Sequence, residues 1–289
     1  MRHLRRSLLF TPADNARMLE KAGTIKSDAL VFDLEDAVVP TSKAAAREVL
    51  RQAAVWKDKG KRDLLIRVND VDTEWFLQDL DLVAELLPDA VILPKATPEA
   101  VVYADHILTA HERSLGLEMN SIRLLPVIET ARGVCELKEI SGAAKRVFGL
   151  QFGAEDFTRD MEIERTKSGE EIMVAKTMMA IVCKAYRIEA IDSPFTDFRD
   201  DEGLKKDCEI AKRIGIVAKT CIHPNQVEIV NEAFMPTREE IEYARGVLAT
   251  AELEENRHKG AFPFMGKMID PPIIARARHI IQKSDLIDE

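Results

Sequence analysis

The sequence predicts an α/β protein, a (β/α)8 TIM barrel with a C-terminal helical extension, and three observations lead to this prediction. Short apolar runs rich in β-branched residues recur along the chain, and each precedes a longer segment of helical periodicity. The runs lie roughly 25 to 40 residues apart, which is the length of a βα unit. Eight such units fill most of the chain, in keeping with the roughly 250 residues that are typical of this barrel.

The eight expected strands each end in polar residues or proline. They are Ser7–Phe10, Ala29–Leu34, Leu64–Val68, Ala90–Pro94, Arg123–Ile128, Val147–Phe152, Ile188–Ile191 and Ile216–Cys221. Amphipathic patterns between them predict helices, for example over Ser42–Trp56 and Glu170–Tyr186. A doubly wound sheet is the alternative, but that fold usually carries G-x-G-x-x-G after its first strand, and this sequence has no such motif.

The pattern changes after the eighth unit. A long charged helix is expected over Thr237–Glu255, followed by an apolar, turn-rich loop over Gly260–Pro272 and a last helix over Ile273–Lys283. We therefore divide the chain into a barrel, 1–235, and a C-terminal helical extension and loop, 236–289. The loop combines Pro and Gly with Phe and Met side chains expected to be exposed, which predicts a segment that docks in an oligomer and contributes to the active site.

Composition excludes several classes of protein. The 289 residues include 41 Lys and Arg against 50 Asp and Glu, a net charge of −9, with 46% hydrophobic residues. This balance excludes disordered, collagen-like and disulfide-scaffold proteins, and it offers no basic surface for nucleic acid or an anionic membrane. The four cysteines form no C-x-x-C pair, and the apolar run behind the basic N-terminus is too short for a signal peptide, so we expect a cytoplasmic protein.

The ends of the expected strands carry an unusual number of charged residues. These are Asp33, Glu35, Asp36, Arg67, Lys95, Glu129, Glu155 and Asp156. Barrel enzymes place their reactive groups where strands end and βα loops begin. A single acid at such a position is ordinarily a helix cap or a solvated loop residue. Several acids that converge with two cations on one rim indicate a functional site.

Glu129 and Asp156 end consecutive expected strands. Neighbouring strands lie about 4.7–4.9 Å apart, so the two carboxylates can reach a shared cation. An all-oxygen site with few protein ligands suits Mg²⁺, which takes its remaining oxygens from water and substrate. Two independent capping carboxylates remain the alternative.

Arg67 lies at the end of a strand expected to be buried and therefore needs an anionic partner. That partner is either Glu35 or Asp36 in an internal salt bridge, or a substrate carboxylate or developing oxyanion held by the forked guanidinium. Both hold if the acids orient the arginine. His223 is more typical of a hydrogen-bonded structural residue than of a general base, and Cys221 has no identifiable base, so we expect it in the core.

Eight motifs, in order along nearly the whole chain, resemble one known family. They are Arg6–Asn15, Phe32–Val38, Arg67–Asn69, Leu93–Lys95, Ile128–Thr130, Phe152–Phe157, Cys221–Gln226 and Gly266–Asp270. The set is similar to the citrate lyase β-subunit family of the HpcH/HpaI aldolase superfamily, which includes malyl-CoA and citramalyl-CoA lyases as close relatives. The motifs are specific to the family and much less specific to one substrate.

The resemblance implies a Mg²⁺-dependent carbon–carbon lyase, usually a homotrimer, that cleaves a citryl-, malyl- or citramalyl-CoA-type thioester into a 2-oxo acid and an acyl-CoA. Carried onto this chain, it assigns Glu129 and Asp156 to the metal and Arg67 to the substrate, with Glu129 beside the substrate; Glu35 and Asp36 keep the supporting role expected from the need of Arg67 for a partner. It places Phe10 and Lys21 along the CoA site and Asp270 in a neighbouring subunit's active site, where it would protonate the product enolate.

Three questions stay open at this point. A thioesterase results if Asp270 directs water at the thioester instead. A non-catalytic metal-binding barrel that serves as a regulatory or scaffold subunit is a third possibility, although Glu129, Asp156, Arg67 and Asp270 together argue against it. True citrate lyase β-subunits also act with partner subunits, and one chain does not reveal whether these exist.

Overall fold

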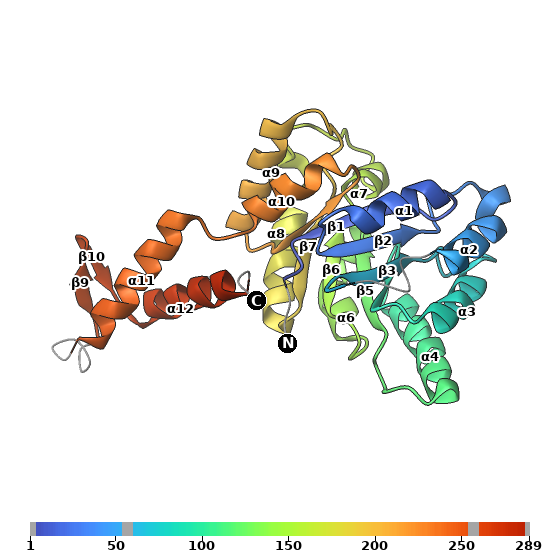
Figure 1. Ribbon diagram of the computed structural model, residues 1–289, viewed down its shortest axis with the longest axis horizontal. Helices are drawn as coiled ribbons and strands as arrows, with labels where there is room; N and C mark the ends of the chain where they lie inside the picture. Colours follow the sequence, from blue (N-terminus) through green and yellow to red (C-terminus); the bar gives the residue numbers. More distant parts are fainter. Residues whose placement is uncertain (1–3, 54–59, 254–259, 287–289) are drawn as a thin grey trace. The chain divides into compact units, whose positions relative to one another are not determined.

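The structure of the protein, a computed structural model, confirms a closed barrel of eight parallel strands in sequence order. It describes residues 4–53, 60–253 and 260–286. The strands are β1 (Ser7–Pro12), β2 (Ala29–Asp33), β3 (Asp63–Arg67), β4 (Ala90–Leu93), β5 (Arg123–Ile128), β6 (Gly149–Phe152), β7 (Glu189–Asp192) and β8 (Ala218–Cys221). In Figure 1 the strand arrows lie in the middle of the barrel, seen obliquely, with helices outside them.

All eight expected strands are present, and no bound moves by more than two residues. The largest shifts are at the starts of β6 and β8 and at the end of β1. Val147 makes only an isolated bridge to Leu124, so β6 begins at Gly149 rather than at Val147. The short apolar runs therefore located the strands, while hydrogen bonding to the neighbouring strand set their ends.

Helices follow the strands around the barrel. They are α1 (Ala16–Thr24), α2 (Lys43–Gln52, after a 3-10 turn at Pro40–Ser42), α3 (Phe76–Leu86), α4 (Pro98–Leu115), α5 (Ala131–Cys135), α6 (Leu137–Gly142), α7 (Ala154–Asp160), α8 (Glu170–Tyr186), α9 (Asp201–Arg213) and α10 (Asn225–Ala233). The expected helix over Glu170–Tyr186 coincides with α8. The one expected over Ser42–Trp56 is shorter as α2, and residues 54–56 lie outside the described residues.

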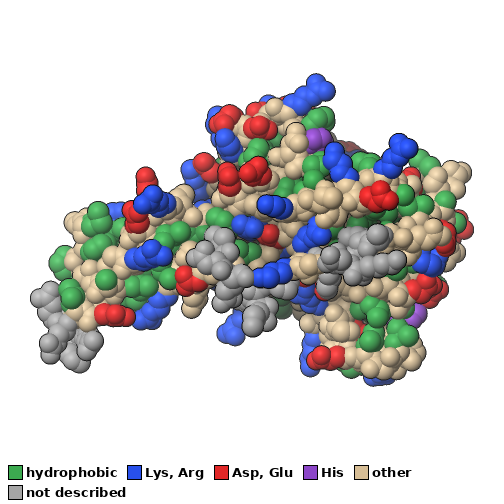
Figure 2. Space-filling view, viewed as in Figure 1, with side chains coloured by type: hydrophobic (Ala, Val, Ile, Leu, Met, Phe, Trp, Pro, Cys, Tyr) green, Lys and Arg blue, Asp and Glu red, His purple; other side chains and the backbone are tan. Residues whose placement is uncertain are grey.

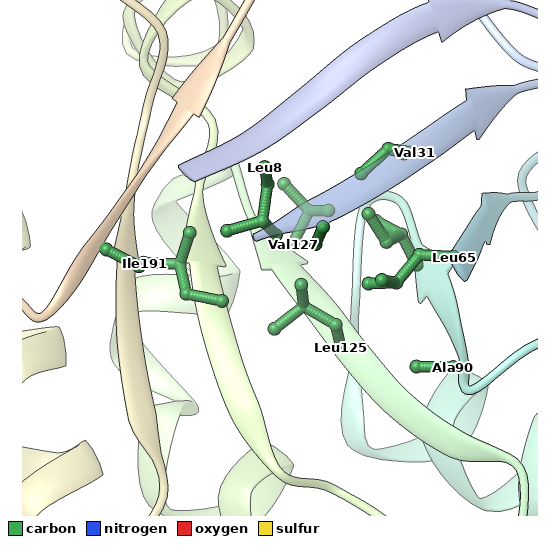
Figure 3. Close-up of a cluster of buried hydrophobic side chains, with 10 residues drawn as sticks. Leu8, Val31, Leu65, Ala90, Leu125, Val127 and Ile191 are labelled. Carbon is green, nitrogen blue, oxygen red and sulfur yellow. The ribbon is translucent and has the colours of Figure 1, made fainter. Parts of the chain in front are cut away.

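Apolar side chains from alternate positions of the strands fill the barrel interior. Its core comprises Leu8, Ala29, Val31, Leu65, Ala90, Ile92, Leu125, Val127, Ile191 and Ala218, with Phe10 and Phe148 packed against it. Figure 3 shows labelled members of this core, such as Leu8, Leu65 and Ile191, pointing into the barrel from different strands. Because alternate residues of a strand share a face, the inward row of β5 continues from Val127 to Glu129. The same alternation carries polar side chains to the carboxyl rim of the barrel.

Contacts within the chain divide it into a barrel unit, Arg5–Asn231, and a C-terminal unit that begins at Glu232 and also includes Leu4. The C-terminal unit contains α11 (Arg238–Glu252), the strands β9 (Phe262–Phe264) and β10 (Lys267–Ile269), and α12 (Pro271–Asp285). Its core comprises Ala244, Val247, Phe262, Ile269 and Ala277.

The segment expected as a loop over Gly260–Pro272 instead forms a hairpin, in which β9 and β10 pair antiparallel. Met265 and Gly266 both have positive φ, 47° and 75°, which is the geometry of a type I′ turn. Phe262 is buried inside its own unit, so the expectation that its side chain is exposed is wrong; Met265 and Met268 are exposed. Burial of alternate residues explains the difference, since the hairpin turns one face toward α11.

Both helices of this unit begin at side-chain caps. Thr237 forms a capping box with Glu240 at the start of α11. Asp270 caps α12, which starts at Pro271 and not at the expected Ile273, because proline is well accommodated in the first helical turn. Residues 254 and 255 of the first expected helix lie outside the described residues.

The surface carries charged side chains of both signs, as the composition predicts. Figure 2 shows acidic and basic side chains interspersed over the visible face. Among the described residues, no helix is both long and apolar enough to span a membrane. Cys183, Cys208 and Cys221 are buried free thiols and Cys135 is an exposed one.

Candidate active site

The carboxyl ends of β2 and β3 hold a forked ion pair. Asp33 and Arg67 end the two strands and lie opposite each other in register. Arg67 donates from Nε to Asp33 Oδ1 at 2.7 Å and from Nη2 to Oδ2 at 2.6 Å. The same carboxylate accepts hydrogen bonds from the backbone N–H groups of Glu35 (2.9 Å) and Ala37 (3.1 Å). Asp33 thus fixes the plane of the guanidinium.

Other acids surround Arg67. Its Nη1 lies 3.0 Å from Glu35 Oε2 and 3.5 Å from Asp36 Oδ2. Nη1 is not aimed at Glu35 Oε2, which accepts no hydrogen bond from the described residues, so this contact is an ion pair only. The guanidinium carbon also lies 5.2 Å from the ring centroid of Phe10. Sequence reasoning named Glu35 and Asp36 as partners and did not assign this role to Asp33.

Lys95 links this cluster to Glu129. Its backbone is left-handed, with φ of 44°, a conformation that costs a residue other than glycine roughly 1–2 kcal/mol. In this conformation its N–H donates to Glu129 Oε1 at 2.6 Å. Its Nζ lies 3.5 Å from Glu35 Oε1 and 3.4 Å from Asp70 Oδ2. Residues held in strained conformations cluster at functional sites, which agrees with the position of Lys95 on the rim.

The surroundings of Glu129 and Glu35 disfavour the charged forms of both carboxyl groups. Burial raises the pKa of Glu129 to about 8, aided by repulsion from Glu35 and Asp156 and opposed by the N–H of Lys95. Burial likewise raises the pKa of Glu35 to about 7, although Arg67 attracts its charged form. A cation between these carboxylates would favour their charged forms.

The donor set fits Mg²⁺. Glu129 Oε1 is occupied by Lys95, whereas Asp156 lies in the first turn of α7 with a partly exposed carboxylate, 2.5 Å from Nη2 of Arg159. Within the described ranges, no group of three or more His, Cys, Asp and Glu side chains is arranged to hold a metal. Two carboxylates with the remaining positions left to water and substrate is the arrangement that Mg²⁺ accepts.

Gly153 makes room for Glu129. A Cβ at this position would lie 2.6 Å from both Cβ and Oε2 of Glu129 and 3.1 Å from Cγ1 of Val127. Real Cβ atoms do not approach other atoms so closely, so Glu129 can take its position only because residue 153 is glycine.

We therefore expect Gly153→Ala to weaken Mg²⁺ binding by at least tenfold, because the added methyl group displaces the Glu129 carboxylate; one tenfold step corresponds to about 1.4 kcal/mol. Isothermal titration calorimetry with Mg²⁺ measures this. Gly23→Ala is the matched control, since nothing lies within 4 Å of its Cβ position. Equal Mg²⁺ affinity in both variants would contradict the assignment of Glu129 to the metal.

The other residues singled out from the sequence have local surroundings of their own. Lys21 is exposed in the last turn of α1. Asp270 belongs to the C-terminal unit, where its carboxylate accepts a hydrogen bond from Ile273 N at 3.3 Å. His223 stacks on Phe198 with centroids 4.9 Å apart. Cys221 is buried as expected, and burial raises the pKa of its thiol, so it is poorly suited to act as a nucleophile.

A closed parallel barrel with an arginine, a lysine and several carboxylates gathered at its carboxyl rim has the architecture of a (β/α)8-barrel enzyme. The model of the HpcH/HpaI aldolase/citrate lyase family matches residues 6–224. The chain therefore belongs to this family and is an enzyme of its citrate lyase beta-like, CoA-thioester lyase branch.

Relatives in this family carry different activities. The citrate lyase subunit beta of Haemophilus influenzae is 34% identical over 97% of this chain and 97% of its own length. The (3S)-malyl-CoA thioesterase of Cereibacter sphaeroides is 33% identical over 99% of this chain and 96% of its own. The structure of CitE from Mycobacterium tuberculosis in complex with magnesium, acetoacetate and coenzyme A has a TM-score of 0.81 and 27% identity, and it covers 99% of this chain and 100% of that one.

Proposed function

We propose that this protein is a Mg²⁺-dependent lyase that cleaves a 3-hydroxyacyl-CoA of the citryl, malyl or citramalyl type into a 2-oxo acid and acetyl-CoA or a related acyl-CoA. The observation that carries the proposal is the Arg67 guanidinium held in a fixed plane by Asp33 beside the buried carboxylate of Glu129. The magnesium, acetoacetate and coenzyme A bound by the M. tuberculosis CitE support it.

Each group has a chemical task in this reaction. Mg²⁺, held by Glu129 and Asp156, would supply a Lewis acid for the hydroxyl and carboxylate oxygens of the substrate. As the hydroxyl passes its proton to solvent and becomes the carbonyl of the 2-oxo acid, the C–C bond breaks and its electron pair moves into a thioester enolate. Arg67 stabilises the negative charge that grows on the thioester oxygen, because its N–H groups are already oriented before that charge develops. Asp270 in its acid form then donates a proton to the enolate carbon.

A thioesterase is the second candidate, and the (3S)-malyl-CoA thioesterase among the relatives favours it. In that reaction Asp270 directs water at the thioester carbon, and the products are free CoA and the hydroxy acid.

The test is to incubate the purified protein and Mg²⁺ with citryl-, malyl-, methylmalyl- and citramalyl-CoA and to detect products by mass spectrometry. A 2-oxo acid with an acyl-CoA identifies the lyase, whereas free CoA with a hydroxy acid identifies the thioesterase. Turnover of none of the four would contradict both and favour a scaffold role.

We further propose that the protein is a homo-oligomer, for example a trimer, in which Asp270 serves a neighbouring subunit. The hairpin tip supports this proposal, because Met265 and Met268 remain 76% and 72% exposed. Large exposed apolar side chains on one hairpin are typical of surfaces that pack against another chain. Phe10 and Lys21 would contact the CoA moiety.

Arg67→Ala and Asp270→Asn are each expected to be nearly inactive alone and to regain part of the activity when co-expressed. In a mixed oligomer, some sites receive an intact Arg67 from one chain and an intact Asp270 from another. The assay compares the mixture with each parent at equal total protein. Absence of recovery, with mass-spectrometric proof that the subunits have mixed, would place Asp270 in its own chain's site or outside catalysis.

A further inference from the structure

A buried lysine lies behind the turn that carries the acids around Arg67. Lys43, the first residue of α2, is only 4% exposed. Its Nζ donates to the carbonyl oxygens of Leu34 and Glu35, each at 2.6 Å. The ammonium also lies 5.3 Å from the ring centroid of Trp75. These contacts tie the backbone of the turn that follows β2 to the start of α2.

A second set of buried groups holds the same turn from the side of β3. Asn69 donates from Nδ2 to the carbonyl of Leu34 at 3.0 Å and to Oδ2 of Asp79 at 2.6 Å. The N–H of Asn69 donates to the same oxygen of Asp79 at 2.9 Å, and Arg47 donates to Asp79 Oδ1 at 2.8 Å. The carbonyl of Leu34 therefore accepts two hydrogen bonds, one from Lys43 and one from Asn69.

Burial lowers the pKa of Lys43, and nearby carboxylates oppose this effect. Burying a lysine is costly unless opposite charges compensate it. The groups that attract the ammonium of Lys43 are Asp33, Asp79, Glu35 and Asp36. Lys43 makes no direct contact with Arg67, so any effect on Arg67 passes through the backbone of Leu34 and Glu35 and then through Asp33.

We propose that Lys43 is a positioning residue of the active site: it fixes the Leu34–Glu35 backbone, which fixes Asp33 and thereby the plane of the Arg67 guanidinium. The backbone part of this inference follows from the hydrogen bonds alone, whereas its kinetic consequence rests on the proposed lyase function. A misplaced guanidinium would stabilise the transition state less while still contributing charge.

The kinetic test is Lys43→Met, which removes the charge and both donors while keeping a long apolar stem. We expect kcat to fall about tenfold and KM to change by less than about threefold, as for a contact made mainly in the transition state. In an Arg67→Ala background the same substitution should have little further effect, because groups that act through one another are not additive. An equal fold loss in both backgrounds would overturn the route through Arg67.

Lys176→Met is the matched control. Lys176 is a second buried lysine, 2.7 Å from Asp192, and its loss leaves Asp192 paired with Lys219, also at 2.7 Å. We expect a lower melting temperature in this variant, with kcat unchanged. Lys43→Gln, which keeps an uncharged NH2 donor group, replaces the methionine variant if that variant does not fold, and a smaller loss of kcat is expected.

Hydrogen exchange separates this inference from the proposed function. The N–H groups of Glu35 and Ala37 donate to the Asp33 carboxylate and report the state of the turn. Relative to the wild type, both N–H groups should exchange faster in Lys43→Met and at the same rate in Lys176→Met. This holds whether or not the protein cleaves any thioester. Unchanged exchange with unchanged kcat would overturn the role of Lys43, whereas faster exchange in a protein without lyase activity would overturn the proposed function alone.

Discussion

Glu129→Gln and Asp156→Asn are each expected to abolish Mg²⁺-dependent activity while leaving the barrel folded. Each change preserves the shape of the side chain but removes one of only two anionic protein ligands to a hard cation. Calorimetric titration with Mg²⁺ should show no measurable binding to either variant. Glu139→Gln, on an exposed position of α6, is the control for loss of one negative charge and should bind Mg²⁺ normally.

Thermal stability provides a reading of the same site that needs no substrate. Burial, together with repulsion from Glu35 and Asp156, disfavours the charged form of Glu129, so Glu129→Gln should match or exceed the wild type in melting temperature without Mg²⁺. With saturating Mg²⁺, only the wild type should rise in melting temperature. A ligand stabilises the folded state that binds it by roughly 2.7 kcal/mol when its concentration is one hundred times its Kd. Unchanged Mg²⁺ affinity in both the Glu129 and the Asp156 variant would refute the metal assignment.

Arg67→Ala should lower kcat by on the order of 10²–10³, the loss typical of one donor to a developing oxyanion. Arg67→Lys should fail to restore the activity. Asp33 uses both of its oxygens to hold Nε and Nη2, and a lysine has a single ammonium that cannot make the two parallel bonds. Steady-state kinetics of the three proteins, at temperatures where each is folded, provide the measurement.

Removal of the guanidinium also leaves Asp33 buried without its main partner, so Arg67→Ala should melt at a lower temperature than the wild type. Arg67→Lys separates the two roles, because it keeps a positive charge for Asp33. A lysine variant with near-wild-type kcat would show that Arg67 acts only as a point charge or as a structural ion-pair partner.

The sequence by itself determined the elements and their order. Eight apolar runs located eight strands, and the helix over Glu170–Tyr186 appeared with the bounds that its pattern predicts. These signals are local, because the side-chain period of a strand or helix is written in consecutive residues. The same local patterns predicted Arg67, Lys95 and Glu129 at the ends of strands. In a barrel of parallel strands these ends lie on one rim, so the three residues share it.

Only the tertiary structure decided how these residues pair. Asp33 is the forked partner of Arg67 because β2 and β3 pair in a register that sets the two side by side, and register depends on hydrogen bonds between strands. The strained backbone of Lys95, the space left by Gly153 and the buried ammonium of Lys43 likewise depend on segments far apart in the chain. Periodicity within one segment carries no information about such contacts, which is why the sequence predicted the rim and the fold alone arranged its charges.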